Sequence, residues 1–171
     1  MFSGHPGTTH GYTADAMSGR RPIEILLIED NPGDVRLAEE AFREAQADAR
    51  LRWVTTVDAA MMALRPGPSA LRVDLDLVLL DLQLPRKDGR QFLTEFRAQA
   101  EWSNVPVVVL TSSSSDDDRL WVSRFEKSWF YTKPMDMDAF VEVARRILSL
   151  SGPDALPAYV ASVQESTGFA G

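Results

Sequence analysis

Four short apolar runs in this chain each end in polar residues, and this repeated pattern limits the possible folds more than any other feature. The polar residues are Glu29-Asp30, Asp81, Thr111-Ser112 and Lys133-Pro134. Short continuous apolar runs that are bounded by polar or turn residues are typical of buried strands in a parallel sheet. The carboxyl ends of parallel strands lie at one edge of the sheet, so we expect these polar side chains to converge there.

The segments between the apolar runs have the periodicity of amphipathic helices, so strands and helices alternate along the chain. Strands are expected at Ile23–Glu29, Leu51–Val57, Asp76–Asp81, Val105–Leu110 and Trp129–Thr132. Helices are expected at Pro32–Gln46, Ala59–Leu64, Gly89–Ala100, Asp116–Lys127 and from Asp136 to about Leu150. This order predicts an α/β fold, a doubly wound parallel sheet covered on both faces with right-handed crossovers.

Helix caps and inner faces can also be predicted from the pattern. Asp58 is expected to cap the second helix. Val141 and Leu150 are expected to lie outside the apolar stripe by which the last helix faces the core. The inner stripes of the last two helices comprise Trp121, Val122, Phe125, Phe140, Val143, Ala144 and Ile147.

Composition divides the 171 residues into one domain and two tails. Residues 1–21 are rich in Gly, Ser, Thr and Pro, and we expect a disordered N-terminal extension. Residues 22–150 form the predicted domain, and residues 151–171 form a C-terminal tail that could support a dimer. No apolar run approaches ~18 residues and no secretory pattern opens the chain, so a cytoplasmic location without a membrane span is expected.

Several function classes are excluded by residue content. The net charge of −7 argues against nucleic acid as a direct partner, because binding to phosphates needs clustered Lys and Arg. The absence of cysteine excludes disulfides, zinc thiolate sites and thiol catalysis. Both histidines, His5 and His10, lie in the N-terminal extension, so histidine catalysis in the folded domain is excluded too.

A group of three carboxylates is the most reactive feature that the strand ends would bring together. Packing Glu29, Asp30 and Asp81 side by side raises their affinity for a proton, and a bound Mg²⁺ relieves the repulsion because it prefers oxygen ligands. A carboxylate can also act as a nucleophile and form an aspartyl phosphate, and Asp81 is the best candidate because it ends the central strand. Lys133 and Thr111 would offer an ammonium and a hydroxyl to the phosphoryl oxygens.

The segment after Asp81 is interpreted as a tight loop ahead of the third helix. The main-chain carbonyl of Gln83 is placed to face the metal, and Gly89 would permit a backbone conformation closed to larger residues. A true aspartyl-phosphate hydrolase usually carries a second aspartate, as general acid, at the position that Gln83 occupies here. Glutamine cannot deliver a proton.

Each of these residues also has an ordinary structural explanation. Acidic residues are favoured at helix N-termini, Asp81 and Thr111 could serve as caps, and Lys133 could be a surface charge. Asp34 and Asp88 are interpreted as capping or turn residues, and Asp116-Asp117-Asp118 as a solvated helix start. However, all four polar groups follow predicted strands, in the order that one site requires. This shared placement favours a functional site over four separate structural roles.

With these motifs, the sequence resembles the response-regulator receiver domains of two-component signalling over roughly residues 22–150. The matching motifs are Glu29-Asp30, Leu79-Leu80-Asp81, Leu84-Pro85, Asp88-Gly89, Leu110-Thr111-Ser112 and Lys133-Pro134. The resemblance implies a flavodoxin-like (βα)5 fold with strand order 2-1-3-4-5. It also implies that Asp81 accepts a phosphoryl group from a phosphohistidine on a sensor histidine kinase.

The resemblance assigns further roles. Asp30, Asp81 and the Gln83 carbonyl bind Mg²⁺, with Glu29 acting largely through water. Lys133 contacts the phosphoryl group, Thr111 moves to bond with it, and Phe130 occupies the aromatic switch position. The segments Glu29–Asp34 and Leu84–Arg90 are similar to the stand-alone receivers paired with bacterial phytochromes. The chain departs from the family at Glu126-Lys127-Ser128, where a small pair is usual, and at Phe130, where tyrosine is commoner.

Signal output is expected to be a change in binding, because no DNA-binding or enzymatic domain follows the receiver. The face of the fourth helix, fifth strand and fifth helix, or the tail beyond Leu150, is expected to form a homodimer or bind a partner. The alternatives are an aspartyl-phosphate-forming hydrolase, a flavin or nucleotide binder, and a pseudo-receiver that is never phosphorylated. The first strand is not followed by the Gly-rich phosphate loop that a nucleotide binder would need.

Overall fold

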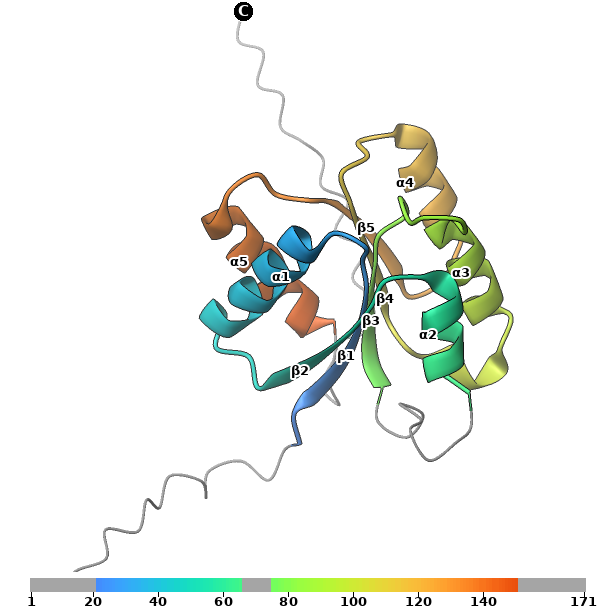
Figure 1. Ribbon diagram of the computed structural model, residues 1–171. Coiled ribbons are helices and arrows are strands. Elements are labelled where there is room, and N and C mark those ends of the chain that lie inside the picture. The colour runs from blue at the N-terminus through green and yellow to red at the C-terminus, as the bar shows by residue number, and fades with distance from the viewer. Residues whose placement is uncertain (1–20, 66–74, 151–171) are drawn as a thin grey trace, which may run out of the picture.

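Five parallel strands form one sheet in the order β2-β1-β3-β4-β5 in the computed structural model, which describes residues 21–65 and 75–150 (Figure 1). The strands are β1 Ile23–Ile28, β2 Ala49–Val54, β3 Leu75–Leu80, β4 Val107–Thr111 and β5 Ser128–Thr132. This is the flavodoxin-like order expected from the sequence. Of the two predicted tails, residues 1–20 of the N-terminal extension and residues 151–171 lie outside the described residues.

Helices cover both faces of the sheet (Figure 1). α1 Pro32–Glu44 and α5 Met137–Ser149 lie together on one face. The other face carries α2 Val57–Ala63, α3 Gly89–Arg97 and α4 Asp116–Val122, with a 3-10 turn, η1, at Ala100–Trp102. Each helix in the described ranges is too short or too polar to span a bilayer.

Two hydrophobic cores follow from the alternation of side chains along the strands. Leu27 and Leu79 point into the core under α1 and α5, and Ile28 and Leu80 point into the core under α2, α3 and α4. β3 contributes its whole run from Leu77 to Leu80 to these cores without exposure. The continuous apolar runs are therefore explained by burial on both faces, which contributes about 1.5–3 kcal/mol per large side chain.

The boundaries of β2 and α2 differ from those predicted. β2 ends at Val54, and α2 begins at Val57, whose side chain is fully buried. The hydroxyl of Thr56 accepts a hydrogen bond from the Ala59 N–H at 3.2 Å, so Thr56, and not Asp58, caps the helix. The prediction was wrong because Val57 has high strand propensity, which its burial on the first turn of the helix overrides.

The last two helices differ from prediction in length and in the buried face. α4 ends at Val122, and the turns that follow reach β5 through Lys127, whose φ of 52° is left-handed. Val141 is buried, and Leu150 packs against the same core. Both were expected off the inner stripe of α5, but this helix packs against α1 as well as the sheet, so its buried face is wider.

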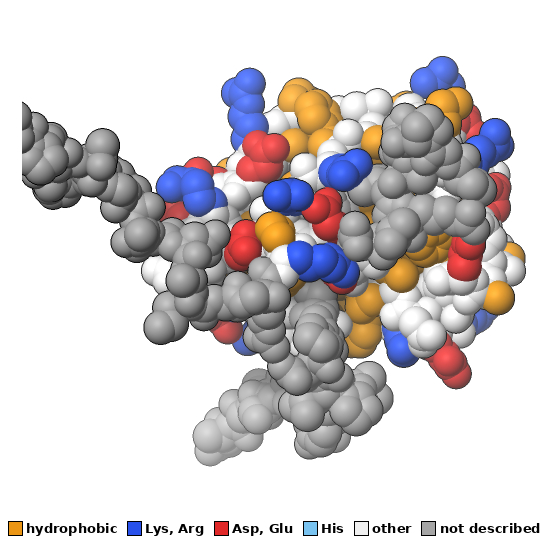
Figure 2. Space-filling model, turned by 90° about the horizontal axis from the view of Figure 1, so that it is seen from below, with side chains coloured by type: hydrophobic (Ala, Val, Ile, Leu, Met, Phe, Trp, Pro, Cys, Tyr) orange, Lys and Arg blue, Asp and Glu red, His pale blue; other side chains and the backbone are white. Residues whose placement is uncertain are grey.

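Ion pairs cover the amino-terminal edge of the sheet, opposite the polar strand ends. Arg21 pairs with Asp76 at 2.6 Å, and the buried Glu24 lies 3.3 Å from Arg50 and 3.5 Å from Arg52. Figure 2, which views the molecule from this edge, shows acidic side chains beside the basic ones. Charges of both signs therefore lie together at this edge of the described sheet.

Candidate functional site

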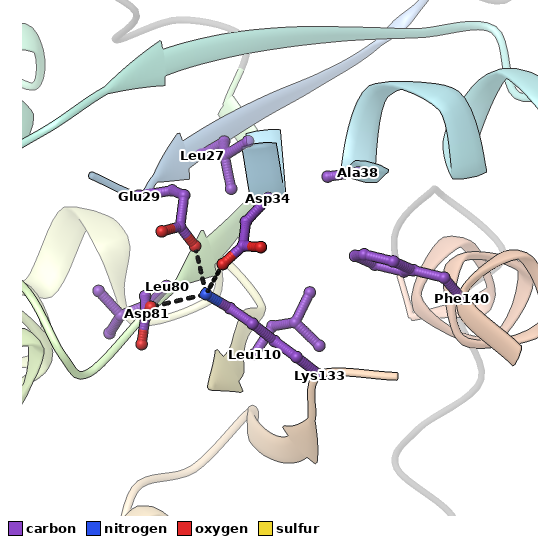
Figure 3. Close-up of a pocket in the computed structure, with 9 residues that line it drawn as sticks. All are labelled: Leu27, Glu29, Asp34, Ala38, Leu80, Asp81, Leu110, Lys133 and Phe140. Atoms are coloured by element: carbon purple, nitrogen blue, oxygen red, sulfur yellow. Dashed lines mark hydrogen bonds and ion pairs between the residues drawn. The ribbon is translucent and has the colours of Figure 1, made fainter. Parts of the chain in front are cut away.

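The ammonium group of Lys133 contacts three carboxylates at the carboxyl edge of the sheet. Its Nζ donates hydrogen bonds to Glu29 Oε2, Asp34 Oδ2 and Asp81 Oδ2, each at 2.7 Å (Figure 3). Glu29 and Asp81 are buried, with 3% and 5% of their surface exposed, whereas Asp34 is partly exposed. The sheet edge therefore brings together three of the four predicted polar groups, through Glu29, Asp81 and Lys133, and it adds Asp34.

Backbone pairing places these side chains. β1 and β3 are neighbours, and the Asp81 N–H donates to the Ile28 carbonyl at 3.0 Å, so the residues after both strands lie side by side. β5 reaches the site through its pairing with β4, because the Lys133 N–H donates to the Thr111 carbonyl at 2.8 Å. The ordinary geometry of a parallel sheet thus brings Lys133 to acidic residues far away in the chain.

The acidic pair after β1 and Asp81 form a group that suits a divalent cation. One carboxylate oxygen from each of Glu29, Asp30 and Asp81 lies within 4.8 Å of the others. Asp30 is exposed, so this group opens to solvent on its side. Mg²⁺ prefers oxygen ligands and keeps several waters, and a half-open set of carboxylates meets both needs.

Burial and neighbouring charges shift the pKa of two groups in the site, Glu29 and Lys133. Burial raises the pKa of Glu29 despite the opposing hydrogen bonds from Lys133 and the Asn31 N–H. Burial alone would lower the pKa of Lys133, but the hydrogen bonds to Asp34, Asp81 and Glu29 outweigh it and raise that pKa above its ordinary value. Lys133 therefore remains an ammonium ion, surrounded by more negative charge than it can neutralise.

The loop after β3 is held by Asp81 and Asp88. The Gln83 N–H donates to Asp81 Oδ1 at 2.9 Å, and Asp88 caps α3 by accepting from the Arg90 N–H at 2.7 Å. The predicted capping role of Asp88 is confirmed. Metal binding by the Gln83 carbonyl stays a prediction.

Gly89 is required for a reason other than the one expected. A Cβ at this position would lie 2.3 Å from the Asp81 carbonyl oxygen, so a larger residue would collide with the end of β3. The backbone of Gly89 is not left-handed, and Arg86, with a φ of 67°, makes that turn in the loop instead. Close approach of helix to strand is the constraint here.

Neither of the two predicted switch residues lines the cavity beside the Lys133 ammonium group. Thr111 ends β4 fully buried, and its hydroxyl accepts from the Ser113 N–H at 3.3 Å. The small cavity of about 10 Å³ beside Lys133 is lined by the preceding Leu110 and not by Thr111 (Figure 3). Phe130 is half-buried on β5 against the core under α4, with the Arg119 guanidinium 4.9 Å above its ring.

Two acidic residues make contacts that were not predicted from the sequence. Asp34 was interpreted as a capping or turn residue, but it binds Lys133 from the first turn of α1. Asp118 was expected in solvent, but it is 8% exposed and pairs with Arg90 and with the Ser113 hydroxyl. An acidic residue in a first helical turn gives no sequence signal that separates a cap from a tertiary ion pair, so neither contact could be predicted.

Comparisons with known proteins place these features in one family. Residues 25–145 match the family model described as the response regulator receiver domain. The chain is 33% identical over 129 residues to the response regulator Rcp1 of Synechocystis sp. (strain ATCC 27184 / PCC 6803 / Kazusa), an alignment that covers 75% of this chain and 88% of Rcp1. It is 37% identical over 106 residues to the probable methanogenesis regulatory protein FilR2 of Methanothrix harundinacea (strain 6Ac), covering 62% and 68% of the two chains.

Solved structures give the same result. The phosphorylated cyanobacterial phytochrome response regulator RcpA is similar with a TM-score of 0.68 and 32% identity, covering 77% of this chain and 94% of RcpA. The Mn²⁺-bound form of Rcp1 has a TM-score of 0.68 and 33% identity, covering 80% of this chain and all of that one (100%). The chain therefore belongs to the response regulator receiver domain family of two-component signalling.

Proposed function

We propose that this protein is a response regulator whose Asp81 accepts a phosphoryl group from a phosphohistidine on a sensor histidine kinase. The observation that carries the proposal is the environment of Asp81. Its carboxylate is buried at the end of the central strand, bonded to Lys133 at 2.7 Å, and grouped with Glu29 and Asp30 within 4.8 Å. This set of groups suits phosphoryl transfer, which depends mostly on positioning and electrostatic stabilisation.

The proposed step forms one bond and breaks one. A carboxylate oxygen of Asp81 attacks phosphorus, the phosphorus–nitrogen bond to the histidine breaks, and the imidazole leaves with its electron pair. Lys133 holds its ammonium within reach of the new phosphoryl oxygens, and Thr111 would donate its hydroxyl to another. A Mg²⁺ ion bound by Glu29, Asp30, Asp81 and the Gln83 carbonyl would neutralise charge on the incoming group.

We propose that a bacteriophytochrome is the partner kinase and that a change in binding is the signal output. The similarity to RcpA, a phosphorylated cyanobacterial phytochrome response regulator, supports a bacteriophytochrome as the kinase. The similarity to the Mn²⁺-bound form of Rcp1 supports a divalent cation at the site. We assign this protein to the cytoplasm. Output would be a change in homodimer or partner binding through the face of α4, β5 and α5, where Leu120 is 61% exposed.

Two alternatives receive less support. A hydrolase with an aspartyl-phosphate intermediate would need a general acid near Asp81, and Gln83 offers an exposed amide at the expected position. A pseudo-receiver would lack part of the reactive set, yet Asp30, Asp81 and Lys133 are all present at the sheet edge. The proposed activity is self-phosphorylation and self-dephosphorylation, without a diffusible substrate to turn over.

Phosphate mapping tests the proposal. The protein is incubated with Mg²⁺ and acetyl phosphate, and any phosphate is located by mass spectrometry of its peptides. We expect one phosphoryl group on Asp81, none in Asp81→Asn, and normal labelling in Asp58→Asn, which removes an exposed carboxylate outside the site. Labelling of Asp81→Asn at the full level would overturn the assignment.

A further inference from the structure

The three hydrogen bonds of Lys133 leave its ammonium group with no donor to spare. An ammonium has three N–H groups, and Glu29, Asp34 and Asp81 accept one each at 2.7 Å. A phosphoryl group on Asp81 can take over the N–H that Asp81 Oδ2 accepts in the unphosphorylated protein. A second hydrogen bond from Lys133 to this group requires release of either Glu29 or Asp34.

Of these two, Glu29 is the harder contact to release. The Glu29 side chain is 4% exposed and also accepts a hydrogen bond from the Asn31 N–H at 3.0 Å. A buried carboxylate that loses its cation pays a desolvation cost that water cannot offset.

Asp34 differs from Glu29 in its surroundings. Its side chain is 27% exposed, and Lys133 is its one side-chain hydrogen-bond donor among the described residues. Water can therefore replace Lys133 at little cost. Asp34 also stands on α1, outside the loops that carry Glu29 and Asp81, so its release requires no movement of the acidic group (Figure 3).

We propose that Asp34 is a positioning residue that holds Lys133 in the unphosphorylated protein and competes with the phosphoryl group for it. The contact stabilises the resting state and is given up on phosphorylation, so Asp34 lowers the occupancy of the phosphorylated state. This inference rests on the proposed function, because it concerns the same lysine and the same acceptor aspartate.

The test compares binding of beryllofluoride, a phosphoryl analogue, to Asp34→Asn and to the wild type in saturating Mg²⁺, by isothermal titration calorimetry. Loss of one partly exposed charged contact should raise the affinity for the analogue about threefold to tenfold. Glu39→Gln is the matched control, since it removes the same charge from the exposed side of the same helix. Asp34→Glu keeps the carboxylate and should restore most of the wild-type affinity.

The outcomes separate the two claims. Unchanged or weaker analogue binding by a folded Asp34→Asn would overturn the inference, as would an equal gain in Glu39→Gln. If Asp34→Asn does not fold, Asp34→Ser takes its place with the same expectation. Failure of the wild type to bind the analogue or to be labelled by acetyl phosphate would instead defeat the proposed function itself.

Discussion

The indole Nε1–H of Trp53 donates a hydrogen bond of 2.6 Å to the main-chain carbonyl of Glu29. Trp53 lies on the edge strand β2 and remains 44% exposed, so this contact is made at the rim of the sheet. The Glu29 N–H also donates to the Val54 carbonyl at 3.0 Å. The backbone that carries the acidic pair is therefore fixed from β2 as well as from β1.

Replacing Trp53 by Phe should weaken Mg²⁺ binding. Phenylalanine keeps an aromatic ring but lacks the N–H, so the turn at Glu29 and Asp30 loses one restraint, worth about 0.5–1.5 kcal/mol for a typical hydrogen bond. We expect an increase in the Mg²⁺ dissociation constant of about twofold to tenfold, measured by calorimetry. Trp129→Phe, on the opposite edge strand, is the control, and an equal loss in both variants would count against a specific role for Trp53.

Replacing Gly89 by Ala should destabilise the fold. The new methyl group would lie 2.3 Å from the Asp81 carbonyl oxygen and 2.8 Å from Leu82 Cα, and both neighbours are backbone atoms that cannot move aside. Overpacking of this kind costs about 1–3 kcal/mol, to be measured as the free energy of unfolding in urea. Gly33→Ala meets a movable side-chain atom of Asn31 at 3.1 Å and should change stability little. Equal losses in the two variants would contradict this account.

Asp118→Asn should reduce stability in a pH-dependent way. The hydrogen bond from Arg90 lowers the pKa of Asp118 below its ordinary value of 3.8, so the charged carboxylate stabilises the folded state above that pH. At neutral pH the variant should lose about 1–3 kcal/mol of unfolding free energy. The difference should shrink as the pH falls below 3.8 and through the lower pKa of folded Asp118, because the unfolded chain binds a proton first and the folded carboxylate then loses its charge. A difference that stays constant at acidic pH would refute the ion-pair explanation.

Replacing Phe130 by Ala should separate phosphorylation from output. The ring packs on the core under α4 and does not line the cavity beside Lys133, so Asp81 should be labelled at the wild-type level. The change in dimer or partner binding should be blunted, because the repacking of α4 against β5 loses its aromatic group. Labelling is followed by mass spectrometry and assembly by light scattering. A dimer shift of wild-type size in the variant would argue against a switch role for Phe130.

The central part of the site could be predicted because it is fixed by strand order alone. Asp81 and Lys133 each follow a continuous apolar run, and such runs identify buried parallel strands whose ends share one edge. Sequence pattern was sufficient here because both the burial and the position of the side chain follow from the strand.

The remaining contacts depend on how helices meet their neighbours, which local pattern does not specify. Asp34 and Asp118 both lie in first helical turns, yet each forms an ion pair with a distant cation. Val141 is buried because α5 packs on α1 as well as on the sheet. The strand propensity of valine also led to the wrong prediction that Val57 ends the second strand. In the structure, burial of its side chain determines the start of α2.

The dependence of Asp81 phosphorylation on Mg²⁺ tests the central claim most directly. The rate of labelling by acetyl phosphate is measured over a range of Mg²⁺ concentrations, with a chelator as the zero point, for the wild type and for Asp30→Asn. We expect labelling of the wild type to rise and saturate with Mg²⁺ and to vanish with the chelator, and Asp30→Asn to need a higher concentration, because it removes one carboxylate of the cation group. Labelling of Asp81 at the same rate with chelator as with Mg²⁺ would contradict the account.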